Sequence, residues 1–331
     1  MDAVPSSVRA ELAAPSKKVP LLLEARSPSL DAVAFVREQR RYLEGCLCEH
    51  GAILLRGFAI EGASALEEVL ASIAPEAMPY IGGITKRSQV HGSIYTASEM
   101  PAPYRVRQHH EMSYAISWPR MLAFFCEVAP EIGGETPICS SRWLVEHLDP
   151  AILETFARKG VTYVRNLTAG GYFTSWQAAF QTSDRAQVEE HCRRSATAWE
   201  WVTDEWLRTR RIGPAVRPHP VTGETLFFNH TGAWHHSIMM QDVRASQAAA
   251  SDAQPQVPES ADSPSDVLYG DGTPIETSII EELVGRYEEG EVALPWAQGD
   301  LLLLDNMLVS HGRRPFQGPR RILASLRLPT S

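Results

Sequence analysis

The apolar residues downstream of Tyr95 occur in short runs, and this pattern constrains the fold more than any other feature of the sequence. Each run has about the length of a strand and ends at Gly, Pro or Asn, which are typical turn residues. The predicted strands are Tyr104–Glu111, Arg120–Glu127, Thr136–Cys139, Thr162–Arg165, Leu226–Asn229, Leu301–Asp305 and Leu308–Ser310. Short strands separated by turns are typical of a closed or sandwiched antiparallel β fold.

Helical patterns precede these strands and interrupt them. Apolar residues fall at helical spacing over Leu30–Leu47 and Ala63–Ile73, and Ala52–Leu55 between them predicts a strand. Later helices are predicted at Ser141–Leu148, Ala151–Lys159, Arg185–Arg194 and Thr277–Tyr287. The sequence therefore predicts a mainly β fold with flanking α-helices.

Two segments show no periodic pattern. The first 20 residues are rich in Pro, Ser and Ala, and we expect a loose N-terminal arm there. Residues 245–266 contain one large apolar side chain, Val257, which cannot bury enough surface to offset the entropy of ordering the segment. We expect a disordered insertion rather than a linker, because the residues after it resemble the end of a β domain. Residues 1–331 are thus predicted to form a single domain.

Composition excludes several classes of protein. The chain has 331 residues and a net charge of −9, which argues against general nucleic-acid binding. No apolar run is long enough to span a membrane, and the N-terminus has no apolar segment typical of a secretory signal. The five cysteines lack disulfide or zinc-finger spacing, so we expect buried or half-buried thiols in the reducing cytoplasm. The oligomeric state cannot be predicted from these features.

A candidate metal site begins with His109 and Glu111. Residues two apart on a strand point to the same face, so this pair supplies two thirds of the facial triad that binds non-haem Fe(II). The pattern is weak by itself, because one such pair is expected by chance. A second pair, His147 and Asp149, lies at a predicted helix junction, and we assign it to chance.

His311 is the candidate third ligand, since it follows an apolar strand and a polar turn. A histidine in this position is often only part of the core, but Arg313, Arg314, Arg320 and Arg321 follow it closely. An arginine fork binds a carboxylate through two hydrogen bonds, as a diacid cosubstrate on the iron would require. A solvated basic loop is the alternative. A competing metal cluster is formed by His230, His235 and His236.

Five motifs in order make the chain resemble the TauD/TfdA family of Fe(II)/2-oxoglutarate-dependent dioxygenases, and most closely its SyrP-like biosynthetic branch. They are Gln108–Tyr114, Gly133–Pro137, His219–Glu224 with Phe227–Asn229, Trp296–His311, and Gly312–Phe316 with Pro319–Ile322. The resemblance implies a double-stranded β-helix (jelly roll) core of the clavaminate synthase-like type. It implies that His109, Glu111 and His311 are the iron ligands. It also implies that Thr136 and Arg321 hold the distal carboxylate of 2-oxoglutarate.

The resemblance further implies an enzyme that uses O2 to hydroxylate an unactivated C–H bond in antibiotic or nonribosomal-peptide biosynthesis. The expected substrate is an amino acid, free or tethered to a carrier protein as an aminoacyl group. Ser325 stands where sulfonate-oxidising members carry a second arginine, and the presence of Glu111 disfavours halogenation. His110 replaces the Asn usual in this branch. Alternatives are desaturation or epoxidation, a cosubstrate-independent dioxygenase or cupin-type isomerase, and a non-catalytic metal-bound binding or sensor protein.

Overall fold

The computed structural model describes residues 3–80, 87–168, 174–249 and 263–330. In this part of the chain the largest sheet has eight strands, in the order β1-β2-β3-β16-β7-β19-β5-β4. The strands in that order are β1 (Val8–Leu12), β2 (Leu21–Ala25), β3 (Ala52–Arg56), β16 (Leu301–Asp305), β7 (Pro119–Val128), β19 (Arg321–Pro329), β5 (Ile94–Thr96) and β4 (Gln89–His91). The central strands β16, β7 and β19 pair antiparallel.

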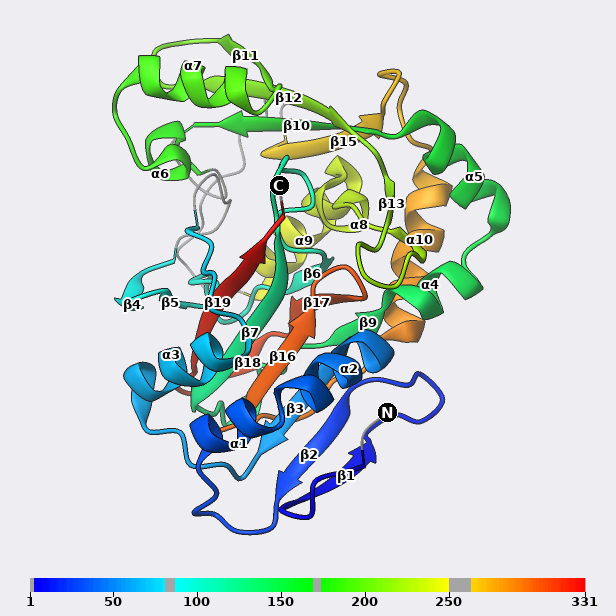
Figure 1. Cartoon of the computed structure of the whole chain (residues 1–331). Helices are drawn as coiled ribbons and strands as arrows, with labels where there is room; N and C mark the ends of the chain where they lie inside the picture. The colour runs from blue at the N-terminus through cyan, green and yellow to red at the C-terminus, as the bar shows by residue number, and fades with distance from the viewer. Residues whose placement is uncertain (1–2, 81–86, 169–173, 250–262, 331) are drawn as a thin grey trace.

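Three helices cover one face of this sheet (Figure 1): α1 (Ala32–Glu38), α2 (Arg40–His50) and α3 (Gly62–Ile73). Helix α3 buries Leu66, Val69, Leu70 and Ile73, which recur at helical spacing and form one apolar stripe. In β16, Leu301 and Leu303 pack into the cluster under the helices, whereas Leu302 and Leu304 pack into the cluster on the opposite face. The all-leucine strand is therefore buried on both faces of the sheet.

The second face lies against a three-stranded sheet with the order β6-β17-β9. Its strands are β6 (Val106–His109), β17 (Val309–Arg313) and β9 (Ile138–Ser140). Around it lie α4 (Ser141–His147), α8 (Thr231–Trp234), α9 (His236–Ala249), α10 (Thr277–Gly290) and the hairpin of β13 (Val216–Pro218) and β14 (Thr225–Phe227). The two sheets enclose the larger apolar cluster, so the predicted jelly-roll core with flanking helices is confirmed.

A four-stranded sheet lies above the jelly roll in Figure 1, with the order β11-β12-β10-β15. Its strands are β11 (Ala198–Trp201), β12 (Leu207–Gly213), β10 (Val161–Leu167) and β15 (Ser265–Tyr269). The accompanying helices are α5 (Pro150–Lys159), α6 (Trp176–Phe180) and α7 (Arg185–Arg194), and the short pair β8 (Ile132–Gly133) and β18 (Phe316–Gln317) completes the elements. A small apolar cluster that includes Trp176 and Leu207 holds α6 and α7 on this sheet.

The N-terminal segment differs from its prediction as a loose arm. Strand β1 pairs antiparallel with β2, and the side chain of Val8 is 1% exposed. The strand buries alternate residues while Arg9 and Glu11 stay at the surface, and this alternation is hidden by the Pro-, Ser- and Ala-rich composition around it. The single helix expected at Leu30–Leu47 is likewise two helices that meet at Gln39.

The predicted insertion at 245–266 also differs at both of its ends. Helix α9 continues to Ala249, and β15 begins at Ser265, where it pairs with Arg165 of β10. Only Ser265 and Asp266 of this strand fall within the predicted insertion, and they are ordered because β15 pairs with β10 and buries Val267 and Tyr269. Residues 250–262 lie outside the described residues.

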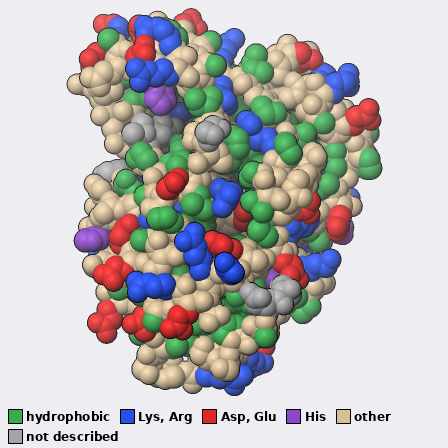
Figure 2. Space-filling view, viewed as in Figure 1, with side chains coloured by type: hydrophobic (Ala, Val, Ile, Leu, Met, Phe, Trp, Pro, Cys, Tyr) green, Lys and Arg blue, Asp and Glu red, His purple; other side chains and the backbone are tan. Residues whose placement is uncertain are grey.

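Surface and cysteine features complete the description. Four of the five cysteine thiols are buried and Cys48 is half-buried, as predicted. Figure 2 shows acidic and basic side chains interspersed over the visible face. Within the described ranges, no helix has both the length and the apolar character needed to cross a bilayer.

Candidate active site

The structure brings His109, Glu111 and His311 together, and we call these three residues the triad. His109 on β6 lies directly opposite His311 on β17 in the antiparallel pairing, with ring centroids 4.3 Å apart. The candidate ligand atoms of all three lie within 4.8 Å of one another, and Glu111 Oε2 is 3.8 Å from His311 Nε2. A Cβ on Gly312 would lie 2.5 Å from the carbonyl oxygen of Val106, so glycine allows this close approach of the strands.

Neighbouring groups orient the ligands. His109 donates its Nδ1–H to the carbonyl of Arg107 at 2.8 Å, which leaves Nε2 free for a metal. The side chain of Asn306 accepts the backbone N–H of Glu111 at 2.8 Å and donates to its carbonyl at 2.9 Å. Burial lowers the pKa of both His109 and His311, so both imidazoles are neutral, which is the form that binds metal.

The donor set of two imidazole nitrogens and one carboxylate oxygen fits Fe(II). Three ligands gathered on one side of an ion leave positions open on the other side for a cosubstrate and O2. His110 follows the last residue of β6, is buried away from this set, and shares a hydrogen bond of 2.9 Å with Ser141. Burial lowers the pKa of His110 to about 3.

The other histidine and carboxylate combinations lie elsewhere. His147 bonds the carbonyl of Trp143, and Asp149 caps α5, so this pair has a structural role. His230 lines the triad cavity and bonds Ser113, whereas His235 and His236 lie beside Asp266. The three predicted members of the competing cluster are therefore not gathered at one site.

The triad lines a cavity of about 390 Å³ between the jelly roll and the four-stranded sheet. Tyr80, Tyr114, Phe124 and Trp234 give it an aromatic wall. The rings of Tyr114 and Trp234 stack with centroids 4.4 Å apart. The wall offers an apolar surface to a ligand beside the triad.

Two neighbouring arginines are placed differently from the sequence prediction. The side chain of Arg321 is 51% exposed, pairs with Glu127 at 2.6 Å and does not line the cavity. Arg320 lines the cavity together with Thr136 and donates Nε–H to the carbonyl of Gly134 at 2.9 Å. Burial lowers the pKa of Arg320 to about 10. The irregular pairing of β19 with β7 at Arg321 sets which of the two side chains turns inward.

Two further arginines follow His311. Arg313 is buried and donates to backbone carbonyls of the loop before β6, including Met100 and Tyr104 at 2.7 Å. Arg314 pairs with Glu291 at 2.7 Å near the surface. Arg313 therefore shapes the cavity wall, and only Arg314 resembles the basic surface loop considered from the sequence.

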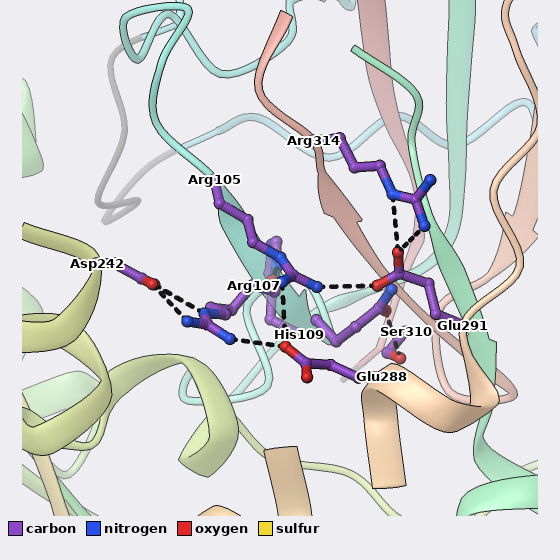
Figure 3. A network of polar contacts seen from close by, with 9 residues as sticks. Arg105, Arg107, His109, Asp242, Glu288, Glu291, Ser310 and Arg314 are labelled. Carbon is purple, nitrogen blue, oxygen red and sulfur yellow. Dashed lines mark hydrogen bonds and ion pairs between the residues drawn. The ribbon is translucent and has the colours of Figure 1, made fainter. Parts of the chain in front are cut away.

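A charged network anchors strand β6 (Figure 3). Arg107 lies between Asp242 of α9 at 2.6 Å and Glu288 of α10 at 3.0 Å. Arg105 pairs with Glu288 at 3.1 Å and with Glu291 at 3.2 Å. The network ties both helices to the strand whose Arg107 carbonyl orients His109.

Sequence reasoning missed three residues around the triad. Arg87 pairs with Glu111 at 2.7 Å, and both side chains are 6% exposed. Arg165 lines the cavity from β10, and Asn306 fixes the backbone of Glu111. Of the three, only Asn306 could have been singled out from the sequence, because it is a polar residue directly after the apolar Leu301–Asp305 run. Arg87 and Arg165 belong to no motif.

A facial triad of two histidines and a carboxylate inside a jelly roll defines the class of non-haem iron oxygenases. The sequence model described as "Taurine catabolism dioxygenase TauD, TfdA family" matches residues 16–326. The chain therefore belongs to the TauD/TfdA family of Fe(II)/2-oxoglutarate-dependent dioxygenases, for which Fe(II) and 2-oxoglutarate are the typical cofactors.

Two relatives agree with this assignment, and a solved structure shares the fold. The chain is 33% identical over 284 residues to the dapdiamide synthesis protein DdaC of Enterobacter agglomerans, covering 86% of this chain and 84% of that protein. It is 32% identical over 330 residues to a clavaminate synthase-like protein of Arabidopsis thaliana, covering 96% and 92%. The solved structure of PvcB, an Fe, α-ketoglutarate-dependent oxygenase from an isonitrile synthetic pathway, matches with a TM-score of 0.55 at 20% identity, covering 99% and 94%.

Proposed function

We propose that this dioxygenase hydroxylates an unactivated C–H bond of an amino acid, or of an aminoacyl group on a carrier protein, in antibiotic or nonribosomal-peptide biosynthesis. The observation that carries the proposal is the complete triad beside a cavity with room for both a cosubstrate and a substrate. The 33% identity to a dapdiamide synthesis protein supports a biosynthetic role.

The proposal gives each cavity residue a task. His109, Glu111 and His311 hold Fe(II), and Thr136 with Arg320 holds the distal carboxylate of 2-oxoglutarate. This role is assigned to Arg320 and not to the predicted Arg321, because of these two residues only Arg320 lines the cavity. Bound iron supplies oxidative chemistry with O2, in which 2-oxoglutarate becomes succinate and CO2 and one oxygen atom enters the substrate.

The protein's own contribution is orientation and exclusion of water. The Arg107 carbonyl and Asn306 fix two of the ligands, and the buried fork of Arg320 matches a carboxylate in a dry environment. The stacked rings of Tyr114 and Trp234 hold the substrate away from bulk water beside the triad. These features support turnover rather than metal-dependent sensing alone.

The experiment that tests the proposal is a succinate-release screen with Fe(II), O2 and 2-oxoglutarate across amino acids and carrier-bound aminoacyl thioesters. We expect one substrate class to stimulate succinate release and to gain one oxygen atom in the product. Products that lose two hydrogens would establish desaturation, and oxygen added across an alkene would establish epoxidation. Cosubstrate binding without stimulation by any member would contradict the proposed substrate class.

A further inference from the structure

The carboxylate of Glu111 is paired with a buried arginine. Nη2 of Arg87 donates to Glu111 Oε2 at 2.7 Å, and both side chains are 6% exposed. The same oxygen lies 3.8 Å from Nε2 of His311, so the guanidinium is one hydrogen bond away from a candidate ligand atom of the triad. Among the described residues, Arg87 is the only lysine or arginine within ion-pair distance of this carboxylate.

Few contacts hold the guanidinium of Arg87 in this position. Its central carbon lies 4.2 Å from the ring centroid of Tyr80, and its Nε is buried without a hydrogen-bond partner. Within the described ranges, the bond to Glu111 is the one hydrogen bond that this side chain makes. An arginine keeps its charge when buried, so the site contains a fixed positive charge that Glu111 balances.

This charge opposes the binding of a divalent cation at the triad. Imidazoles bind a metal as neutral groups, so Glu111 is the only charged group of the triad. The triad together with Arg87 has no net charge, whereas the triad alone would have one negative charge. A divalent cation binds more strongly to the negative arrangement, because charges interact strongly in a site of low polarity.

The same charge favours the binding of an anion after the metal. 2-Oxoglutarate is a dianion, and a divalent cation with Glu111 leaves one positive charge to meet it. Arg87 adds a second positive charge beside the triad, so the dianion meets an equal opposite charge. Arg165 and Arg320 also line the cavity, but their charges are the same in the natural protein and in a variant at residue 87.

We propose that Arg87 divides binding free energy between the two cofactors: its charge weakens binding of the divalent metal and strengthens binding of 2-oxoglutarate to the metal-loaded site. Arg87 acts through Glu111, so it is a positioning residue and not a ligand of the ion. The effect favours binding of the cosubstrate after the metal. This inference rests on the triad as the metal site and is independent of the identity of the primary substrate.

The first measurement is Mn(II) binding to the whole protein, followed by equilibrium dialysis without cosubstrate. Arg87→Gln and Arg87→Met both remove the charge, and we expect each to bind Mn(II) about 10-fold more tightly, the lower range for close buried charges. Arg87→Lys keeps a positive charge and should bind Mn(II) nearly as weakly as the natural protein does. Glu111→Ala establishes that the ion is bound at the triad, and melting curves establish that the variants remain folded.

The second measurement is anaerobic titration of 2-oxoglutarate into protein saturated with Fe(II), followed by the visible charge-transfer band. The two neutral variants should require about 10-fold more 2-oxoglutarate than the natural protein, and Arg87→Lys should restore most of the loss. Arg40→Gln is the matched control, since it removes the same charge from an exposed position on α2, where Arg40 pairs with Glu44. It should change neither titration.

The opposite directions of the two shifts separate a charge effect from damage to the site. Weaker binding of both ligands by the neutral variants would assign Arg87 a structural role and overturn the inference, as would unchanged binding of both. Mn(II) binding that is the same in Glu111→Ala as in the natural protein would contradict the triad itself, and this inference with it. Failure of the substrate screen would contradict the proposed substrate class alone, because neither titration contains a primary substrate.

Discussion

The three-stranded sheet β6-β17-β9 and the four-stranded sheet β11-β12-β10-β15 both border the cavity, but they contribute to it differently. The first places His109 and His311 directly opposite each other by strand pairing, and Glu111 follows in the turn after β6, where the Asn306 side chain bonds its backbone. The second contributes Arg165 and neighbouring residues of β10, while the aromatic wall beside them comes from other elements. The two histidines of the triad thus lie on neighbouring strands of one sheet. The residues on the other side of the cavity come from several separate elements.

The largest effect on turnover is expected from substitution of Glu111, a metal-ligand candidate. Glu111→Ala removes the only charged ligand of the triad, so we expect turnover to fall about 1,000-fold or more while the fold persists. Glu111→Asp should keep partial activity, because a shorter carboxylate can still reach the ion. Succinate release and iron content measure both. An alanine variant that binds iron and retains full activity would place the metal site elsewhere.

The cosubstrate end is tested by its two neighbouring arginines. Arg320→Ala should raise the apparent requirement for 2-oxoglutarate by roughly 30- to several-thousand-fold, since loss of a buried charge-assisted pair costs about 2–5 kcal/mol. Arg321→Ala should change it little, because an ion pair with a half-exposed arginine contributes about 0–1 kcal/mol. Steady-state kinetics at varied 2-oxoglutarate distinguish them. A defect confined to Arg321→Ala would restore the role that the sequence predicted for Arg321.

Substitution of Asn306 tests whether iron binding depends on the backbone conformation of Glu111. Its buried side chain bonds both backbone groups of Glu111 and the carbonyl of Pro119. Asn306→Ala leaves these groups without their partner, so we expect the free energy of unfolding to fall by roughly 2–4 kcal/mol, with weaker iron binding. Denaturant titration and iron titration measure the two effects. Asn306→Asp keeps the acceptor for Glu111 N–H but sets a buried carboxylate oxygen against the carbonyls of Glu111 and Pro119, so it should lose at least as much stability as Asn306→Ala.

The smallest effect is expected far from the cavity, in β1. Val8→Ala should lower the free energy of unfolding by about 1–2 kcal/mol, because it removes buried methyl groups, and should leave turnover unchanged. Arg9→Ala is the control at the exposed neighbouring position. Equal stability of the two variants would mean that the N-terminal segment is the loose arm that its composition predicts.

Much of the fold and the triad could be predicted because they follow from periodicity. Alternation along a strand predicts that His109 and Glu111 share one face, and the apolar run before His311 marks a core strand. The structure ends β6 at His109 and places Glu111 in the turn that follows, so the position of Glu111 depends on that turn and not on alternation. Alternation also predicts that Arg320 and Arg321 face opposite ways, but not which one turns inward. That choice depends on the irregular pairing of β19 with β7, which is a property of two strands together.

The other side of the cavity had no comparable local pattern. Arg165 reaches the cavity only because β10 pairs with β12 and β15 and the resulting sheet packs over the jelly roll. Val8 is buried only because β2 provides a partner strand. β1 alternates apolar and charged residues, but whether so short a run is buried depends on the strand that pairs with it, so the burial of Val8 and the position of Arg165 require the structure.

The most direct test of the account is anaerobic titration of Fe(II) and 2-oxoglutarate followed in visible light. The account predicts a weak charge-transfer band in the natural protein, no band in Glu111→Ala, and in Arg320→Ala a band that appears only at much higher 2-oxoglutarate. Arg321→Ala should match the natural protein. Absence of the band from the natural protein, or an unchanged titration in both Glu111→Ala and Arg320→Ala, would contradict the assignment of this cavity as the iron and 2-oxoglutarate site.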